Sequence, residues 1–136
     1  MFKATNIATP EMIYKSCEEV QLFIEATYDA DNPTECVARA QSAEGYMGLT
    51  SKMLADAKYH YDSLLNGIFI DAIKKAEGVR MQTSTLNKYI DTLCYDYNYL
   101  VTWSDRLNRS CTHCLDLQRS FISKLKAEFS ATSWHK

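Results

Sequence analysis

The sequence predicts an all-α fold, in which a long antiparallel hairpin of two helices carries a shorter N-terminal helix. Three observations support this fold class: capping residues next to both prolines, apolar residues spaced alternately three and four positions apart, and no strand-like alternation. With 136 residues and 46% apolar content, the chain is long enough to bury a core without disulfides. We therefore expect residues 1–136 to form a single helical domain, a coiled-coil-like three-helix bundle.

The first helix is expected over residues 10–28. Thr9 offers an N-cap, Pro10 suits the first helical turn, and Glu11 complements the positive end of the helix dipole. The buried face of this helix should consist of Ile13, Cys17, Val20 and Ile24.

The second helix, expected over residues 33–77, begins with a stronger capping signal. Asn32 offers the cap, Pro33 occupies the first turn, and Glu35 stands at the capping-box position. Gly78 is expected to end the helix.

Gly45 and Gly48 interrupt this second helix, and each costs about 1 kcal/mol relative to alanine in a helix interior. The apolar spacing nevertheless continues through both glycines. We therefore predict one uninterrupted helix, in which small residues around positions 38–48 let a neighbouring helix approach closely. The predicted seam comprises Cys36, Ala40, Ala43, Met47, Thr50, Leu54, Ala57, Tyr61, Leu64 and Ile68.

The third helix is expected over residues 84–130, after the capping residues Thr83, Ser84 and Thr85. Its apolar positions follow an unbroken heptad pattern, which is typical of coiled-coil packing. At 1.5 Å per residue each long helix would extend about 65 Å. The predicted seam comprises Leu86, Ile90, Leu93, Tyr97, Leu100, Ser104, Leu107, Cys111, Cys114, Gln118, Phe121 and Leu125.

The five cysteines are an odd number and are scattered, which favours reduced thiols in a core over a disulfide framework. Cys111 and Cys114 form a CxxC pair, which is also the spacing of half a zinc site. A zinc site would need two further ligands, drawn from Cys36, Cys94, His60 and His113. Because the pair lies on the seam, we interpret it as core packing and predict no metal.

No motif in the sequence supports catalysis. A Walker loop, HExxH, GxSxG, a dinucleotide fingerprint and paired Glu-x-x-His are all missing from the sequence. The stretch from Asp29 to Asn32 resembles the start of an EF-hand loop. An EF-hand would then need a ligand-bearing turn with a glycine, but Pro33 and Thr34 occupy these positions, so the motif fails. We therefore predict that the chain is not an enzyme and uses no cofactor or small-molecule substrate.

A second face of the third helix lies off the seam and combines aromatic and basic residues. It can be a solvated face with Asp105–Arg109 and Asp116–Arg119 pairs, a surface buried by the first helix, or a contact for a partner. Tyrosine beside arginine is typical of protein-binding hot spots. The predicted partner-binding stripe comprises Tyr95, Tyr99, Trp103, Arg106, Arg109 and His113.

The alternative function is binding of nucleic acid. The formal net charge of −2 means that such binding would need a local basic patch. With the stripe arginines, that patch would comprise Lys74, Lys75, Arg80 and Arg119. The N-terminal residues do not read as a signal peptide and no apolar run is long enough to span a membrane, so we expect a cytoplasmic protein without membrane contact.

Residues 103–128, WSDRLNRSCTHCLDLQRSFISKLKAE, combine an aromatic residue, an acid, Arg-Leu-Asn-Arg, Cys-Thr-His, Asp and Arg. This run resembles the C-terminal segment of short helical proteins of unknown function encoded by tailed phages and prophages. The resemblance implies a phage or mobile-element protein acting in the host cytosol, and it implies no catalytic residues. We expect a non-enzymatic adaptor or inhibitor of a host protein complex, which binds a protein partner or a second copy of itself. The alternative is a nucleic-acid-binding accessory protein of phage replication or recombination.

Overall fold

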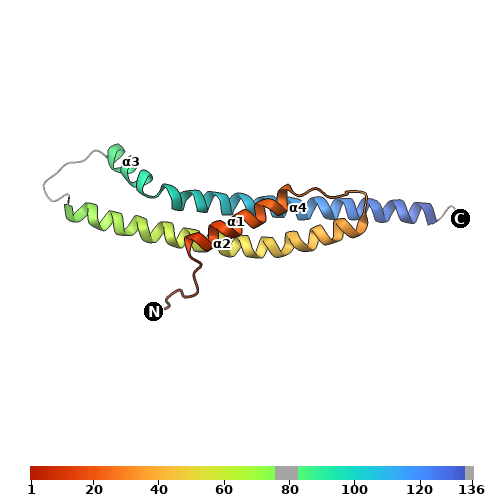
Figure 1. Ribbon diagram of the computed structural model, residues 1–136, viewed down its shortest axis with the longest axis horizontal. Helices are drawn as coiled ribbons and strands as arrows, with labels where there is room; N and C mark the ends of the chain where they lie inside the picture. The colour runs from red at the N-terminus through yellow and green to blue at the C-terminus, as the bar shows by residue number, and fades with distance from the viewer. Residues whose placement is uncertain (76–82, 134–136) are drawn as a thin grey trace.

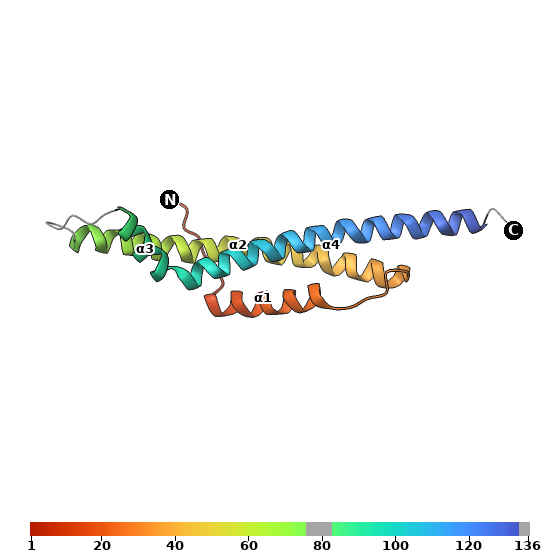
Figure 2. The ribbon, with the colours of Figure 1, turned by 90° about the horizontal axis from the view of Figure 1, so that it is seen from above.

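The structure of the chain, a computed structural model, describes residues 1–75 and 83–133 and is all-helical over them (Figure 1). α2 and α4 lie side by side and form a long antiparallel pair, and α1 lies across the middle of this pair (Figures 1 and 2). The predicted fold class is thereby confirmed, but the prediction of three helices is wrong. The described residues form four helices: α1 Pro10–Glu25, α2 Pro33–Lys75, α3 Thr83–Leu93 and α4 Tyr95–Ser133.

α1 begins as the sequence predicts and ends earlier. The Thr9 hydroxyl accepts a hydrogen bond from the amide of Met12 at 3.2 Å, so it serves as the N-cap. The helix ends at Glu25, about one turn before the expected boundary at residue 28. Of the predicted buried face, Ile13, Cys17 and Val20 are fully buried and Ile24 is half-buried.

α2 starts at the predicted cap. The Asn32 side-chain oxygen accepts from the amides of Thr34 and Glu35 at 3.0 and 3.3 Å. The Glu35 carboxylate accepts instead from the amide of Asp29 at 3.2 Å, so it anchors the α1–α2 connection rather than completing a capping box. The predicted end of this helix at Gly78 lies outside the described residues.

α2 continues through Gly45 and Gly48 without interruption, which confirms the prediction from the apolar spacing. Among the small residues around positions 38–48, Ala43 and Ala40 pack against Cys114 and Leu115 of α4, but the glycines take no part in this approach. A Cβ atom added at either position would meet no atom within 4 Å, so no neighbouring helix approaches there. The glycines lie on an exposed side of the helix, while the seam residues Ala43, Thr50 and Ala57 are buried.

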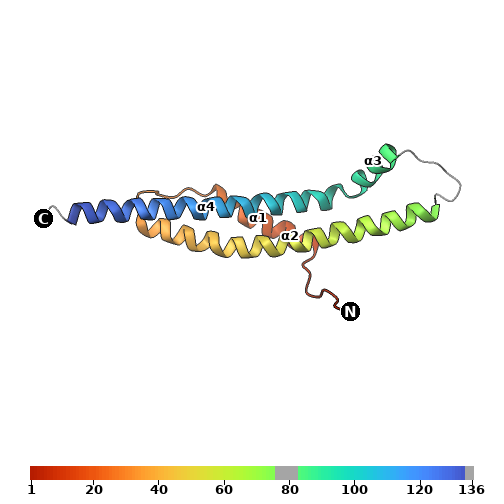
Figure 3. The ribbon, with the colours of Figure 1, turned by 180° about the vertical axis from the view of Figure 1, so that it is seen from behind.

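The predicted third helix is divided at Cys94 into α3 and α4, which corrects the expectation of one helix over residues 84–130. Backbone hydrogen bonds run from the Cys94 amide to Ile90 at 3.0 Å and from the Asn98 amide to Cys94 at 2.9 Å, so the break is a kink rather than a loop. α3 tilts away from the axis of α4 (Figures 1 and 3). Leu93, expected on the seam, is 44% exposed, whereas its neighbour Cys94 at the kink is buried.

α1 runs antiparallel to α2 and parallel to α4, and the largest core cluster forms where the three helices meet. The start of α1 lies near the middle of α2, and its end lies near the start of α2, where Arg39 contacts Phe23. The buried members of this cluster are Ile13, Cys17, Val20, Met53, Ala57, Leu100, Leu107 and Cys111.

The segment before α1 is tied to α2 by three polar side chains that lie one turn apart. The Asp56 carboxylate accepts from the Ala8 amide at 3.1 Å and pairs with Lys52 at 2.5 Å. Lys52 also donates to the Asn6 carbonyl at 3.2 Å, and the His60 ring nitrogen donates to the Ala8 carbonyl at 2.6 Å. Asn6 adopts a φ of 61°, a conformation that asparagine tolerates better than most residues. These contacts fix the direction in which the chain enters α1.

Candidate functional site

All six residues of the predicted stripe lie on α4, and α1 covers only the middle of the stripe. The Trp103 ring packs edge-on against Tyr14 of α1 at a centroid distance of 5.6 Å. Its indole nitrogen donates to the Gln21 side chain at 3.1 Å, and Trp103 is half-buried as a result. Burial by α1 therefore accounts for Trp103, and the stripe is left open on both sides of it.

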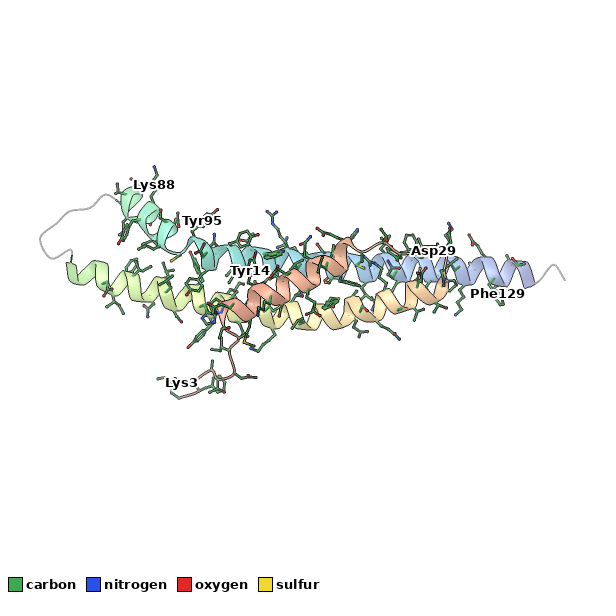
Figure 4. All side chains as sticks on the ribbon, in the orientation of Figure 1. Lys3, Tyr14, Asp29, Lys88, Tyr95 and Phe129 are labelled. Atoms are coloured by element: carbon green, nitrogen blue, oxygen red, sulfur yellow. The ribbon has the colours of Figure 1, made fainter. Side chains whose placement is uncertain are left out.

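Tyr95 and Tyr99, upstream of Trp103, remain 71% and 52% exposed. Tyr95 projects from the start of α4, beyond the end of α1 that carries Tyr14 (Figure 4). The ring centroids of Tyr99 and Trp103 are 5.7 Å apart. Tyr99 also lines an open groove of about 540 Å³ between α1 and α4. We call this the aromatic groove; its lining residues are Pro10, Glu11, Tyr14, Lys15, Glu18, Asp96, Tyr99 and Leu100.

Downstream of Trp103 the basic residues of the stripe are solvated. Arg106 is exposed, and Arg109 pairs with Asp105 at 3.3 Å while its side chain stays 79% exposed. Arg119 pairs with Asp116 at 3.7 Å, and its side chain is 69% exposed. Both predicted ion pairs are thereby confirmed. Such exposed pairs contribute only tenths of a kcal/mol, so they place few constraints on these arginines.

A second groove, of about 510 Å³, lies where the end of α1 and the α1–α2 connection meet α4. It takes in Arg109 and His113 from the predicted stripe, but its inner residues were not predicted as site residues. We call this the Arg39 groove. It is lined by Ile24, Tyr28, Arg39, Arg109, Ser110, His113, Cys114, Leu117 and Gln118.

Arg39 of α2 is held rigidly by the end of α1. Its guanidinium group donates to the carbonyls of Phe23, Ile24 and Ala26 at 3.2 to 3.4 Å. The guanidinium carbon also lies 4.7 Å from the centre of the Phe23 ring and 4.3 Å from that of Tyr28. A cation is well suited to the negative end of a helix dipole, so Arg39 caps α1 from another helix. Its Nε atom is buried and has no hydrogen-bond partner.

Gln118 of α4 lies opposite and is fully buried. Its side-chain nitrogen donates to the Tyr28 hydroxyl at 2.8 Å, while its side-chain oxygen is buried without a partner. Because a hydroxyl can donate or accept, either orientation of the amide leaves one of its ends unpaired. Sequence reasoning placed Gln118 on the seam, and a glutamine at a heptad seam position was the available signal of a special polar role.

The five cysteines are all buried and free, which confirms their interpretation as core thiols. Burial raises the pKa of Cys111 to about 11, and the neighbouring Cys114 adds to the rise while Arg39 opposes it. Burial also raises the pKa of Cys17, Cys36 and Cys94. These thiols stay protonated at neutral pH, in a form that neither attacks carbonyls nor binds metal well. Among the described residues, no group of three His, Cys, Asp or Glu side chains could hold a metal ion.

The residues of the alternative nucleic-acid patch are not brought together. Lys74 and Lys75 end α2 at the hairpin tip, whereas Arg119 lies in the second half of α4, towards the opposite end of the molecule (Figure 1). Arg80 lies outside the described residues.

Comparisons with protein-family profiles, with curated proteins and with solved structures found no significant match to this chain. Within residues 1–75 and 83–133, none of the helices combines the length and apolar character needed to cross a membrane.

Proposed function

We propose that the chain is a non-enzymatic interaction protein of a phage or mobile element, which acts in the host cytosol as an adaptor or inhibitor of a host protein complex. The phage origin is supported by the resemblance of residues 103–128. The binding function is supported by the open aromatic and basic surface of α4, flanked by two grooves.

The observation that carries the proposal is the exposure of Tyr95 and Tyr99. Tyrosine rings bury on the order of 150–250 Å² each when covered, and they are enriched in the energetic centres of protein interfaces. Here, the Tyr99 ring lies tilted against Trp103 at the edge of a groove, and Tyr95 lies one turn upstream, 71% exposed. Neither α1 nor α2 covers these two rings. A partner chain that covered them would bury a continuous aromatic surface.

The test compares the chain with a Tyr95→Ser, Tyr99→Ser double variant in affinity capture from cells of the host. The matched control is Tyr89→Ser, because Tyr89 is also exposed but lies on α3, outside the stripe. We expect the native chain and the control to retain the same protein and the double variant to lose it. Equal retention by all three chains would contradict the proposal.

The nucleic-acid alternative has its own signature, because contacts with phosphates release counterions and weaken steeply with salt. Titration of the purified chain with duplex and single-stranded DNA at increasing salt separates the two functions. Binding that falls steeply with salt and is reduced by Arg119→Gln would favour the alternative. We expect no such binding, since the basic residues are dispersed along the molecule.

A further inference from the structure

We infer that the aromatic groove receives an arginine side chain of a partner polypeptide. This inference rests on the proposed interaction function and adds the chemistry of the partner. The groove opens between α1 and α4 and has a volume of about 540 Å³, which is typical of ligand-binding clefts. Each wall contributes a tyrosine, Tyr14 from α1 and Tyr99 from α4. These side chains are 46% and 52% exposed, so a ligand in the groove reaches both rings.

Trp103 holds the two tyrosine rings in place. Its ring packs edge-on against Tyr14 at a centroid distance of 5.6 Å and lies tilted against Tyr99 at 5.7 Å. The Trp103 indole is itself fixed by its hydrogen bond to Gln21. A ligand therefore meets rings that are already ordered, which reduces the entropy lost on binding. The faces of aromatic rings attract cations, and the cation in such contacts is more often arginine than lysine.

A carboxylate accompanies each tyrosine along its helix. Glu11 and Glu18 lie three residues before and four residues after Tyr14, on the same face of α1. Asp96 lies three residues before Tyr99 on α4. All three acids are exposed, and none of them pairs with a basic residue in the described part of the chain. Accessible carboxylates beside aromatic rings suit a guanidinium group, which stacks on rings and donates to carboxylates.

The net charge of the lining also favours a cation. The three carboxylates are accompanied by one basic residue, Lys15. Glu11 in addition offsets the positive end of the α1 dipole, which equals about half a charge, so the lining stays net negative. Lys15 is exposed and can turn its flexible side chain into solvent. Pro10 and Leu100 supply apolar lining, which suits the aliphatic stem of an arginine.

The basic residues of the stripe lie outside this groove. Arg106 and Arg109 follow Tyr99 by about two and three helical turns, and neither of them lines the groove. The surface of α4 is therefore acidic at the aromatic groove and basic beyond Trp103. A partner that covers both parts should carry a basic side chain at the groove and acidic side chains opposite the arginines.

The experiment titrates the full chain, with ¹³C-labelled tyrosine rings, with the N-acetylated and C-amidated pentapeptide Gly-Leu-Arg-Leu-Gly. Arginine is the only charged residue of this probe. Two matched peptides replace the arginine by lysine or by citrulline, which keeps the shape of arginine without its charge.

We expect saturable shifts of the Tyr14 and Tyr99 ring resonances with the arginine peptide. The lysine peptide should bind at least about threefold more weakly, and the citrulline peptide should give no saturable shift. Equal binding of the lysine or the citrulline peptide would overturn the inference. So would the absence of a saturable shift at these two rings at millimolar concentrations of the arginine peptide.

A change of the α4 ring tests the aromatic contact. Tyr99→Leu keeps an apolar side chain but removes the ring, and it should weaken binding of the arginine peptide by about threefold to tenfold. Tyr89→Leu is the matched control, because Tyr89 is exposed on α3 and does not line the groove. An affinity that Tyr99→Leu leaves unchanged would overturn the inference.

A second pair of variants tests the carboxylates. Glu18→Gln with Asp96→Asn should weaken the arginine peptide by about threefold to tenfold, because the guanidinium group loses its charged acceptors. The control, Glu44→Gln with Asp71→Asn, makes the same change of net charge at exposed positions of α2 outside the groove. Equal loss of affinity in both double variants would show attraction by overall charge and would overturn the inference.

Failure of the peptide experiment leaves the proposed function separately testable. If the arginine peptide does not bind while the Tyr95 and Tyr99 double variant still loses its partner, the arginine assignment falls and the interaction function stands. If the peptide binds and all chains retain the same proteins in affinity capture, the groove is an arginine site and the aromatic stripe is not the partner contact.

Discussion

The guanidinium carbon of Arg39 lies 4.3 Å from the centre of the Tyr28 ring, and this stack joins three parts of the fold. Tyr28 belongs to the α1–α2 connection and also accepts a hydrogen bond from Gln118 of α4. Arg39 belongs to α2 and holds the last carbonyls of α1. The pair therefore fixes the end of α1 against both long helices, and the same contacts shape the Arg39 groove.

Replacement of Arg39 by methionine should lower the free energy of unfolding by about 2–4 kcal/mol, because hydrogen bonds to a charged group and a cation–π contact are lost together. The methionine retains most of the apolar stem, so the change isolates the guanidinium group. Urea unfolding followed by circular dichroism measures the effect. Arg106→Met serves as the control and should change stability by less than about 0.5 kcal/mol. Equal effects of the two substitutions would show that Arg39 is no cap.

Asp56→Ala should release the segment before α1 and lower the free energy of unfolding by about 1–3 kcal/mol. The buried Asp56 carboxylate accepts from Ala8 and pairs with Lys52, so its loss leaves the half-buried Ala8 amide without this partner. The Ala8 amide should exchange its hydrogen faster in the variant, as hydrogen-exchange mass spectrometry would show. Asp62→Ala, at an exposed position of α2, should leave that exchange rate unchanged.

The sequence predicted those parts of the fold that depend on local signals. The caps at Thr9 and Asn32 and the continuity of α2 follow from side-chain chemistry and from the spacing of apolar residues within one helix. The kink at Cys94 has no such signal, because neither proline nor glycine lies near it. The stretch CYDYNY, which begins at Cys94, consists of residues with middling or weak helix propensity. Tertiary packing then decides where a weak helix bends, which no local pattern records.

The candidate site was predicted only in part, because local patterns show which residues share a helix face but not how the helices pack. The outer stripe could be located because its residues share one face of one helix. Which of them α1 covers could not be predicted, since this depends on how α1 crosses the hairpin. The Arg39 groove combines residues of α1, α2 and α4 that are distant in sequence, such as Tyr28 and Gln118, which are 90 positions apart. In the sequence, Arg39 lies between two alanines, in a part of the helix rich in small residues. This context gave no sign that Arg39 caps α1.

Gly45→Ala and Gly48→Ala should each stabilise the protein by about 0.5–1 kcal/mol. Alanine has the higher helix propensity, and a new Cβ atom meets no atom within 4 Å at either position. Thermal unfolding of the single and double variants measures the gain, which should be additive. A loss of stability would instead show that these positions need glycine for a bend or for contact with a partner chain.

The double change Arg106→Glu with Arg109→Glu should leave the helical circular dichroism and the melting temperature nearly unchanged. Both side chains are exposed, and the Asp105–Arg109 pair contributes only tenths of a kcal/mol. Binding of the partner that the native chain captures should weaken, because charge reversal at an interface opposes association. Unfolding of this variant would show that the arginines are structural. Unchanged folding and unchanged partner binding would show that this part of the stripe is only solvated.

The stability of the protein should fall as the pH rises from about 9 to about 11. The thiol of Cys111 has a pKa of about 11 in the folded chain, against 9.0 for a free thiol, because burial disfavours the thiolate. Folding therefore holds the proton more tightly, and this contribution is fully present below about pH 9 and is lost as the pH rises through the folded pKa. A shift of this size corresponds to about 3 kcal/mol for Cys111.

The pH dependence is measured by urea unfolding in reducing buffer at several pH values across this window. Cys111→Ala removes the ionisable group, so it should be less stable near neutral pH but should lose less stability between about pH 9 and pH 11. A residual slope is expected in the variant, because burial also raises the pKa of Cys17, Cys36 and Cys94 and that of Tyr46. If the native chain and the variant lose stability in parallel over this range, the Cys111 thiol does not ionise as its burial requires.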